Sequence, residues 1–140
     1  MEVKKLSVIV PAYNEEATIQ TILTTLAGVK LLHNISMEII VVNDCSRDKT
    51  AERLQQFIDT NPQLNIRAFH HEKNKGKGAA LHTGIANATG DYTIVQDADL
   101  EYDPLQYRVL LAPILEDRAD VVFGSRYLQP ERRRVLSYWH

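Results

Sequence analysis

Short apolar segments alternate regularly with longer amphipathic ones along this chain, and few folds accommodate such a pattern. Each short segment is bounded by polar or turn-forming residues, and most are rich in β-branched residues, as is typical of buried strands. Their centres are roughly 30 residues apart, close to the length of a βαβ unit. The expected strands are residues 6–10, 38–42, 65–69, 92–96 and 120–123, the third nearer a sheet edge.

Between these strands, apolar residues recur with the spacing of a helix face. Ser46 or Asp48 is available to cap the second expected helix, and Pro104 suits the first turn of the fourth. Pro113 is expected to kink the fourth helix or to end it near Leu111. The predicted core-facing residues are Ile19, Ile22, Leu23 and Leu26, then Ala51, Leu54, Phe57 and Ile58, then Ala80, Leu81, Gly84, Ile85 and Ala88, and last Leu105, Val109, Ala112 and Leu115.

Strands that alternate with helices predict an α/β fold with a mostly parallel, Rossmann-like sheet and helices on both faces. In such sheets, ligands bind outside the carboxyl ends of the strands. The polar residues that directly follow the expected strands are therefore the candidates for a functional site.

Composition narrows the class of protein. A length of 140 residues suits one domain, and a hydrophobic content of 44% excludes a disordered chain. With 16 Lys and Arg against 18 Asp and Glu, the chain lacks the basic excess of a general nucleic-acid binder, so no nucleic-acid partner is expected. The single cysteine, Cys45, excludes an internal disulfide, and no apolar run is long enough to span a membrane. We expect a cytoplasmic domain.

Acidic residues follow the fourth expected strand. Asp97 and Asp99 are two residues apart in an extended segment, so their carboxylates project to the same side. Hard oxygen ligands of this kind suit Mg²⁺ or Mn²⁺, with phosphate oxygens completing the coordination, and Glu101 is a candidate third ligand. A solvated turn is the alternative, but the position after a buried strand favours the metal site.

The residues that follow the other expected strands suggest a nucleotide-binding site. Tyr13 and Asp44 would be neighbours if the first two strands are adjacent, and an aromatic face beside a carboxylate could receive a nucleobase. Capping of the following helix is the alternative role of Asp44. The segment 75–78, Lys-Gly-Lys-Gly, opens the third expected helix, where free N–H groups attract anions. His70 and His71 are adjacent, so their side chains should diverge rather than share a metal.

Taken together, these segments resemble the inverting GT-A glycosyltransferases of family 2, the group that includes dolichol- and polyprenol-phosphate sugar synthases. The resemblance covers nearly the whole chain. It rests on VIVPAYNEE (8–16), VVNDCSRDKT (41–50), NKGKGAAL (74–81), DYTIVQDADLEYDP (91–104) and ADVVFGSRYL (119–128). One departure is Asn43, where this family often has an acid.

The resemblance implies a nucleotide-sugar donor of the GDP-mannose or UDP-glucose type, a divalent metal, and transfer with inversion. The implied catalytic residues are Asp97, Asp99 and Arg126, and the implied metal ligands are Asp97, Asp99 and Glu101. The implied donor-binding residues are Pro11, Ala12, Tyr13, Glu15, Asp44, Lys75, Asp97, Arg126 and Arg134.

Similar proteins continue beyond the point where this sequence stops, so we expect a GT-A fold that is truncated at its C-terminus. Residues 1–128 would form the nucleotide-sugar-binding domain, and residues 129–140 would begin an acceptor region. A polyprenyl phosphate is the favoured acceptor, because a phosphate monoester is already anionic and needs no general base. Exposed apolar surface could drive self-association, and the basic, aromatic residues 132–140 suit the cytoplasmic membrane surface in a longer protein.

Other functions are not excluded by the residues alone. One alternative is a fragment that binds the donor without turnover, and another is a transferase that acts on a glycan hydroxyl. Both would have the same donor site as the favoured function. A nucleotidyltransferase is disfavoured, because no glycine-rich loop follows the first strand. A phosphoacceptor domain is disfavoured as well, because its acids would follow the first and third strands.

Overall fold

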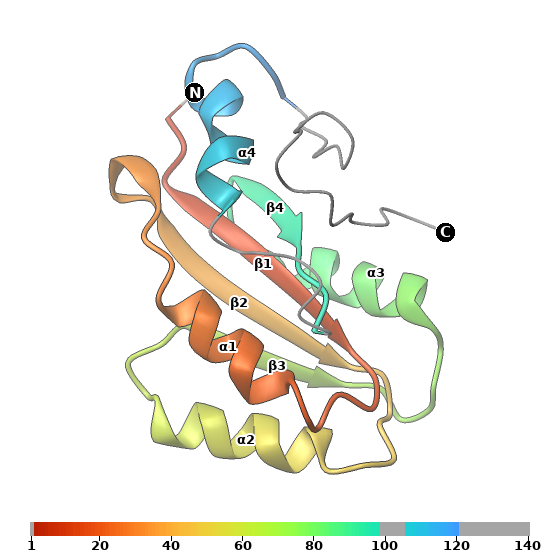
Figure 1. Ribbon diagram of the computed structural model, residues 1–140. Helices are drawn as coiled ribbons and strands as arrows, with labels where there is room; N and C mark the ends of the chain where they lie inside the picture. Colours follow the sequence, from red (N-terminus) through yellow and green to blue (C-terminus); the bar gives the residue numbers. More distant parts are fainter. Residues whose placement is uncertain (1, 99–105, 121–140) are drawn as a thin grey trace, which may run out of the picture.

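The computed structural model describes residues 2–98 and 106–120. Strands and helices alternate there as expected (Figure 1). Among the helices of the described ranges, none is long and apolar enough to cross a membrane. The elements are β1 (Lys5–Ala12), α1 (Ile19–Ala27), a 3₁₀ turn (Leu32–Asn34), β2 (Ser36–Asn43), α2 (Thr50–Thr60), β3 (Ile66–His70), α3 (Lys77–Asn87), β4 (Tyr92–Val95) and α4 (Tyr107–Leu115).

The described strands form one parallel sheet in the order β3-β2-β1-β4. Ala12 pairs with Asn43, and Asn43 pairs with His70, so β1, β2 and β3 end level with one another. The arrowheads in Figure 1 accordingly point to the same edge. This confirms the mostly parallel sheet. Most of the expected strand at residues 120–123 lies outside the described residues.

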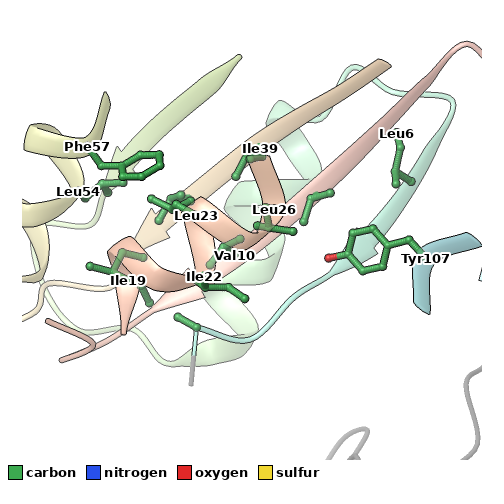
Figure 2. Packing of buried hydrophobic residues seen from close by; sticks show 14 of the residues in the cluster. Leu6, Val10, Ile19, Ile22, Leu23, Leu26, Ile39, Leu54, Phe57 and Tyr107 are labelled. Atoms are coloured by element: carbon green, nitrogen blue, oxygen red, sulfur yellow. The ribbon is translucent and has the colours of Figure 1, made fainter. Parts of the chain in front are cut away.

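Successive residues of a strand face opposite sides of the sheet, and each side has its own core. Val8 and Val10 of β1 belong to the larger cluster, which also contains buried residues of α1, α2 and α4 (Figure 2). Ile40 and Val42 of β2 belong to the smaller cluster, together with Ala80 of α3. Helices α1, α2 and α4 therefore cover one face and α3 covers the other, which confirms the prediction of helices on both faces.

The first two helices agree with their predicted faces. All four predicted residues of α1 are buried, as are Leu54 and Phe57 of α2. The start of α2 is stabilised by Asp48, whose carboxylate accepts hydrogen bonds from the N–H (2.9 Å) and the hydroxyl (2.5 Å) of Thr50. Asp48, rather than Ser46, thus satisfies an orphan N–H group at this end.

The faces of α3 and α4 differ from the prediction. Ile85 is 57% exposed, because it lies about 100° round the helix from Gly84, which packs on the sheet. Val109 is 63% exposed, and Tyr107 and Leu111 are buried in its place. The Tyr107 hydroxyl donates to Oε1 of the buried Gln96 over 2.7 Å, which fixes this rotation of α4.

Pro113 does not end α4, which continues to Leu115. Proline removes only its own N–H bond, and the Glu116 N–H still donates to the Ala112 carbonyl over 3.1 Å, which closes the last turn. Pro104 and Leu105 lie outside the described residues.

Gly84 lets α3 approach β1 closely, and replacing it with alanine is expected to lower the free energy of unfolding by about 1–3 kcal/mol. A Cβ atom there would lie 2.4 Å from Cγ2 of Ile9, which has no exposed surface and little room to move. Gly78 in the same helix is the control, because its Cβ would meet nothing within 4 Å. Urea denaturation measures both variants. A Gly84→Ala protein as stable as Gly78→Ala would show that the contact is not tight.

Candidate functional site

The loops that follow β1 and β2 are joined by hydrogen bonds. The Asn14 N–H donates to Ser46 Oγ over 3.0 Å, and Asn14 Oδ1 accepts from the Arg47 N–H over 2.8 Å. Asn14 has a φ of 52°, a left-handed conformation that asparagine tolerates better than most residues. Beside it, the Glu15 N–H donates to Thr50 Oγ1 over 2.8 Å. These bonds fix the β1 loop against the start of α2.

Asn43 connects the β2 loop to β3. Its Oδ1 accepts from the N–H (3.1 Å) and the hydroxyl (2.6 Å) of Ser46, which orients the amide so that Nδ2 lies 3.1 Å from Nδ1 of His70. A carboxylate at this position could not donate to the histidine ring. Asn43 therefore uses both ends of its amide, the oxygen toward the β2 loop and the nitrogen toward β3.

Asp44 anchors the loop between β3 and α3. Its Oδ1 accepts from His71 Nδ1 (2.7 Å) and from the Lys75 N–H (2.9 Å), and its Oδ2 accepts from the Gly76 N–H (2.8 Å). Burial by itself would raise the pKa of Asp44, but these hydrogen bonds and the nearby imidazole outweigh it and lower the pKa. Asp44 is therefore ionised at neutral pH. Its oxygens bind His71 and the loop before α3, so it does not cap α2.

Gly76 and Lys77 form the turn into α3. Gly76 is the N-cap residue and has a φ of 93°, which a side chain would strain. Lys77 is the first helical residue, and its Nζ lies 2.7 Å from Oδ1 of Asp97, directly after β4. This ion pair joins α3 to the carboxyl end of β4 across the site. The lysine side chain is 54% exposed and that of Asp97 is 17% exposed.

These loops surround an open cavity of about 510 Å³ at the carboxyl edge of the sheet. It combines an aromatic ring, two carboxylates anchored at strand ends, a lysine and the beginning of a helix. The cavity is lined by Pro11, Ala12, Tyr13, Glu15, Asp44, Asn74, Gly76, Lys77, Ala80, Asp97 and Ala98.

Six residues selected from the sequence therefore line the same cavity, from Pro11 in the β1 loop to Asp97 after β4. Lys75 takes part through its backbone, whereas Lys77, which the sequence analysis did not select, contributes its ammonium group. The basic motif at the start of α3 was the available signal, but it could not show which lysine faces the cavity. Asp99, Glu101, Arg126 and Arg134 lie outside the described residues.

Among the described residues, Asp97 is a candidate ligand for a divalent cation. Asp97 offers carboxylate oxygens at the cavity wall, and such hard donors fit Mg²⁺ or Mn²⁺. Within residues 2–98 and 106–120, no three His, Cys, Asp or Glu side chains converge to hold a metal. His70 contacts Asn43 and His71 contacts Asp44, so the two side chains diverge as expected.

Comparison with known proteins identifies the family. Residues 7–137 match the family described as Glycosyl transferase family 2. The chain is 33% identical over 125 residues to the dolichol-phosphate mannosyltransferase of Pyrococcus furiosus, a match that covers 89% of this chain and 34% of the relative. The chain thus spans about a third of that relative's length.

Solved structures agree on the fold. A mannosyltransferase from Pyrobaculum calidifontis, in complex with GDP-Man and Mn²⁺, superposes with a TM-score of 0.65 at 29% identity, over 71% of this chain and 28% of that one. Glucosyl-3-phosphoglycerate synthase from Mycobacterium tuberculosis, with Mn²⁺, UDP and glucosyl-3-phosphoglycerate, superposes at 0.63 and 28% identity, over 80% of this chain and 40% of that one. These neighbours confirm the Rossmann-like GT-A fold. The chain therefore belongs to glycosyl transferase family 2.

Proposed function

We propose that this chain binds the nucleotide-sugar donor of a hexosyltransferase that glycosylates a polyprenyl phosphate, with inversion at the anomeric carbon. The observation that carries the proposal is the cavity at the carboxyl edge of the sheet, where Tyr13, Asp44, Asp97 and Lys77 converge. Known GT-A relatives of similar fold bind GDP-Man or UDP together with Mn²⁺, and a mannosyltransferase relative is named for dolichol phosphate.

The described side chains suit the two ends of a nucleotide. Tyr13 is 42% exposed and lines the cavity, so its ring can stack on a base. Asp44 Oδ2 accepts one described hydrogen bond, so it retains an acceptor position for a base N–H or a ribose hydroxyl. Lys77 lines the cavity beside the N-terminus of α3, and together they offer positive charge to the diphosphate.

A divalent cation, when bound at Asp97, would neutralise charge on the diphosphate. We propose Mg²⁺ or Mn²⁺ there, with Asp99 and Glu101 as further ligands, and Arg126 and Arg134 facing the phosphates. Lys77 already pairs with Asp97, so this lysine and a cation would divide the carboxylate oxygens between them. The assignments of Asp99, Glu101 and the two arginines rest on the family resemblance alone.

Acid–base chemistry favours a phosphate acceptor in this proposal. An acceptor oxygen attacks the anomeric carbon opposite the diphosphate, the carbon–oxygen bond to the diphosphate breaks, and the nucleoside diphosphate leaves. A hydroxyl acceptor would need a general base within hydrogen-bond reach, whereas a phosphate monoester is already anionic.

Donor binding without transfer by this chain alone is the second candidate, because the chain spans only about a third of its relative. We further propose a cytoplasmic location at the membrane surface and self-association.

Calorimetric titration with UDP and GDP, each with and without Mn²⁺, tests donor binding. The wild-type chain is expected to bind at least one of them more tightly with the metal, and binding of neither would contradict the proposal. A transfer assay with UDP- or GDP-sugar and polyprenyl phosphate then separates an active chain from a binding fragment.

Lys77→Ala is expected to weaken diphosphate binding about tenfold, because one charge-assisted contact is lost from a half-exposed site. The control is Lys73→Ala, which removes an equal charge from an exposed position in the loop before α3. Titration at low ionic strength measures both. Equal losses in the two variants would show that Lys77 acts only through the overall charge.

A further inference from the structure

His71 connects two elements that flank the site, although it does not line the cavity itself. Its side chain is 8% exposed. Nδ1 lies 2.7 Å from Asp44 Oδ1 at the end of β2, and Nε2 lies 2.8 Å from Thr83 Oγ1 in α3. The Thr83 hydroxyl also lies 3.1 Å from the carbonyl oxygen of Ala79, one turn earlier in the helix. The imidazole is thus a buried bridge between β2 and the middle of α3.

The bridge bears on Lys77 because the start of α3 is held from two directions. Asp44 binds the backbone N–H groups of Lys75 and Gly76, immediately before the helix. Thr83 lies in the same helix as Lys77, between one and two turns further on. With both contacts in place, α3 cannot tilt or slide along its axis without breaking a hydrogen bond.

We propose that His71 is a positioning residue, which sets Lys77 against Asp97 and the donor diphosphate by tying α3 to the carboxylate of Asp44. This inference rests on the proposed donor site. It assigns a role to a side chain that touches neither the ion pair nor the cavity. Loss of the imidazole should leave the sheet intact and weaken the donor contact that depends on the position of α3.

The experiment is a double-mutant cycle between His71→Phe and Lys77→Ala, read by titration with UDP and GDP in the presence of Mn²⁺. His71→Phe alone is expected to weaken binding about fivefold, because both contacts of the imidazole are lost while Asp44 still binds the Lys75 and Gly76 N–H groups. In the Lys77→Ala background, the same substitution should cost less than twofold, because the group that it positions is absent. His82→Ala is the control, since this histidine is exposed on the same helix.

A readout without nucleotide keeps the test independent of donor binding. Deuterium uptake of residues 72–78 should rise in His71→Phe and in the milder Thr83→Val, but not in His82→Ala. Unchanged uptake in the first two variants would overturn the inference even if nucleotide binds as expected. An equal loss of affinity with and without Lys77 would overturn it as well, since His71 would then act through Asp44 or on the fold as a whole, and not through Lys77.

The two proposals fail in different ways. If the wild-type chain binds neither nucleotide, the donor site is wrong and the role of His71 falls with it. If the wild-type chain binds and His71→Phe binds equally well, only the role of His71 is wrong.

Discussion

Replacing Glu38 with alanine is expected to lower the free energy of unfolding by about 3–5 kcal/mol. Glu38 is 2% exposed, and it accepts from the Ser7 hydroxyl (2.6 Å) and from the N–H (2.6 Å) and hydroxyl (3.0 Å) of Thr89. Lys5 and Arg67 lie 3.6 and 3.3 Å from its Oε2. Alanine would leave the Ser7 and Thr89 donors without their partner, and each such loss is costly.

The position of Glu38 explains the size of this effect. Its contacts reach β1, β3 and the turn before β4, and Ser7 Oγ also accepts from the Gly90 N–H over 2.8 Å. The network therefore joins β4 to β1 at the edge of the sheet opposite the cavity. Urea denaturation at neutral pH measures the loss, with Glu2→Ala, an exposed acid, as control. An alanine variant as stable as the control would contradict the network's importance.

The same carboxylate predicts an acid-dependent loss of stability. Burial alone would raise the pKa of Glu38, but the hydrogen bonds from Ser7 and Thr89 and the charge of Lys5 outweigh it and lower the pKa from 4.5 to about 2. The stabilisation is therefore complete above pH 4.5 and is lost as the pH falls towards 2, amounting to about 3 kcal/mol. Glu38→Gln should flatten the stability profile in this interval, and a profile identical to wild type would assign the acid sensitivity to other groups.

The spacing of apolar residues along the chain was enough to predict the strands and the first helix. The β-branched segments placed the described strands, and the three-to-four-residue repeat placed the buried face of α1. The segment YRVLLAPIL of α4 is apolar on several sides, so more than one face fits the repeat. A contact distant in sequence, between Tyr107 and Gln96, decides which face is buried.

The site shows the same division. Because carboxyl ends of parallel strands meet at one edge, the sequence could place Tyr13, Asp44 and Asp97 together. It could not show that Asp44 holds backbone N–H groups more than thirty residues away, since backbone groups leave no mark in a sequence. Nor could it choose between Lys75 and Lys77, because the φ of Gly76 sets where α3 begins.

Asp44→Asn is expected to weaken nucleotide binding about a hundredfold, although the two side chains have nearly the same shape. Oδ1 of the carboxylate accepts from His71 and Lys75, and Oδ2 accepts from Gly76. In the asparagine variant one of these oxygens becomes an NH₂ group, which faces at least one N–H donor and cannot accept from it. The loop must then move, and the proposed contact to the base or ribose is lost as well.

Two measurements separate the roles of Asp44. Deuterium uptake of residues 72–78 reports on the loop, and titration with UDP and GDP in the presence of Mn²⁺ reports on the donor. Both should change in Asp44→Asn and neither in Asp59→Asn, which makes the same substitution at an exposed residue of α2. If uptake rises while affinity is unchanged, Asp44 anchors the loop without contacting the donor. If affinity falls while the loop remains protected, the Asp44 carboxylate itself binds the nucleotide. The three hydrogen bonds would then serve to keep this carboxylate ionised for the donor.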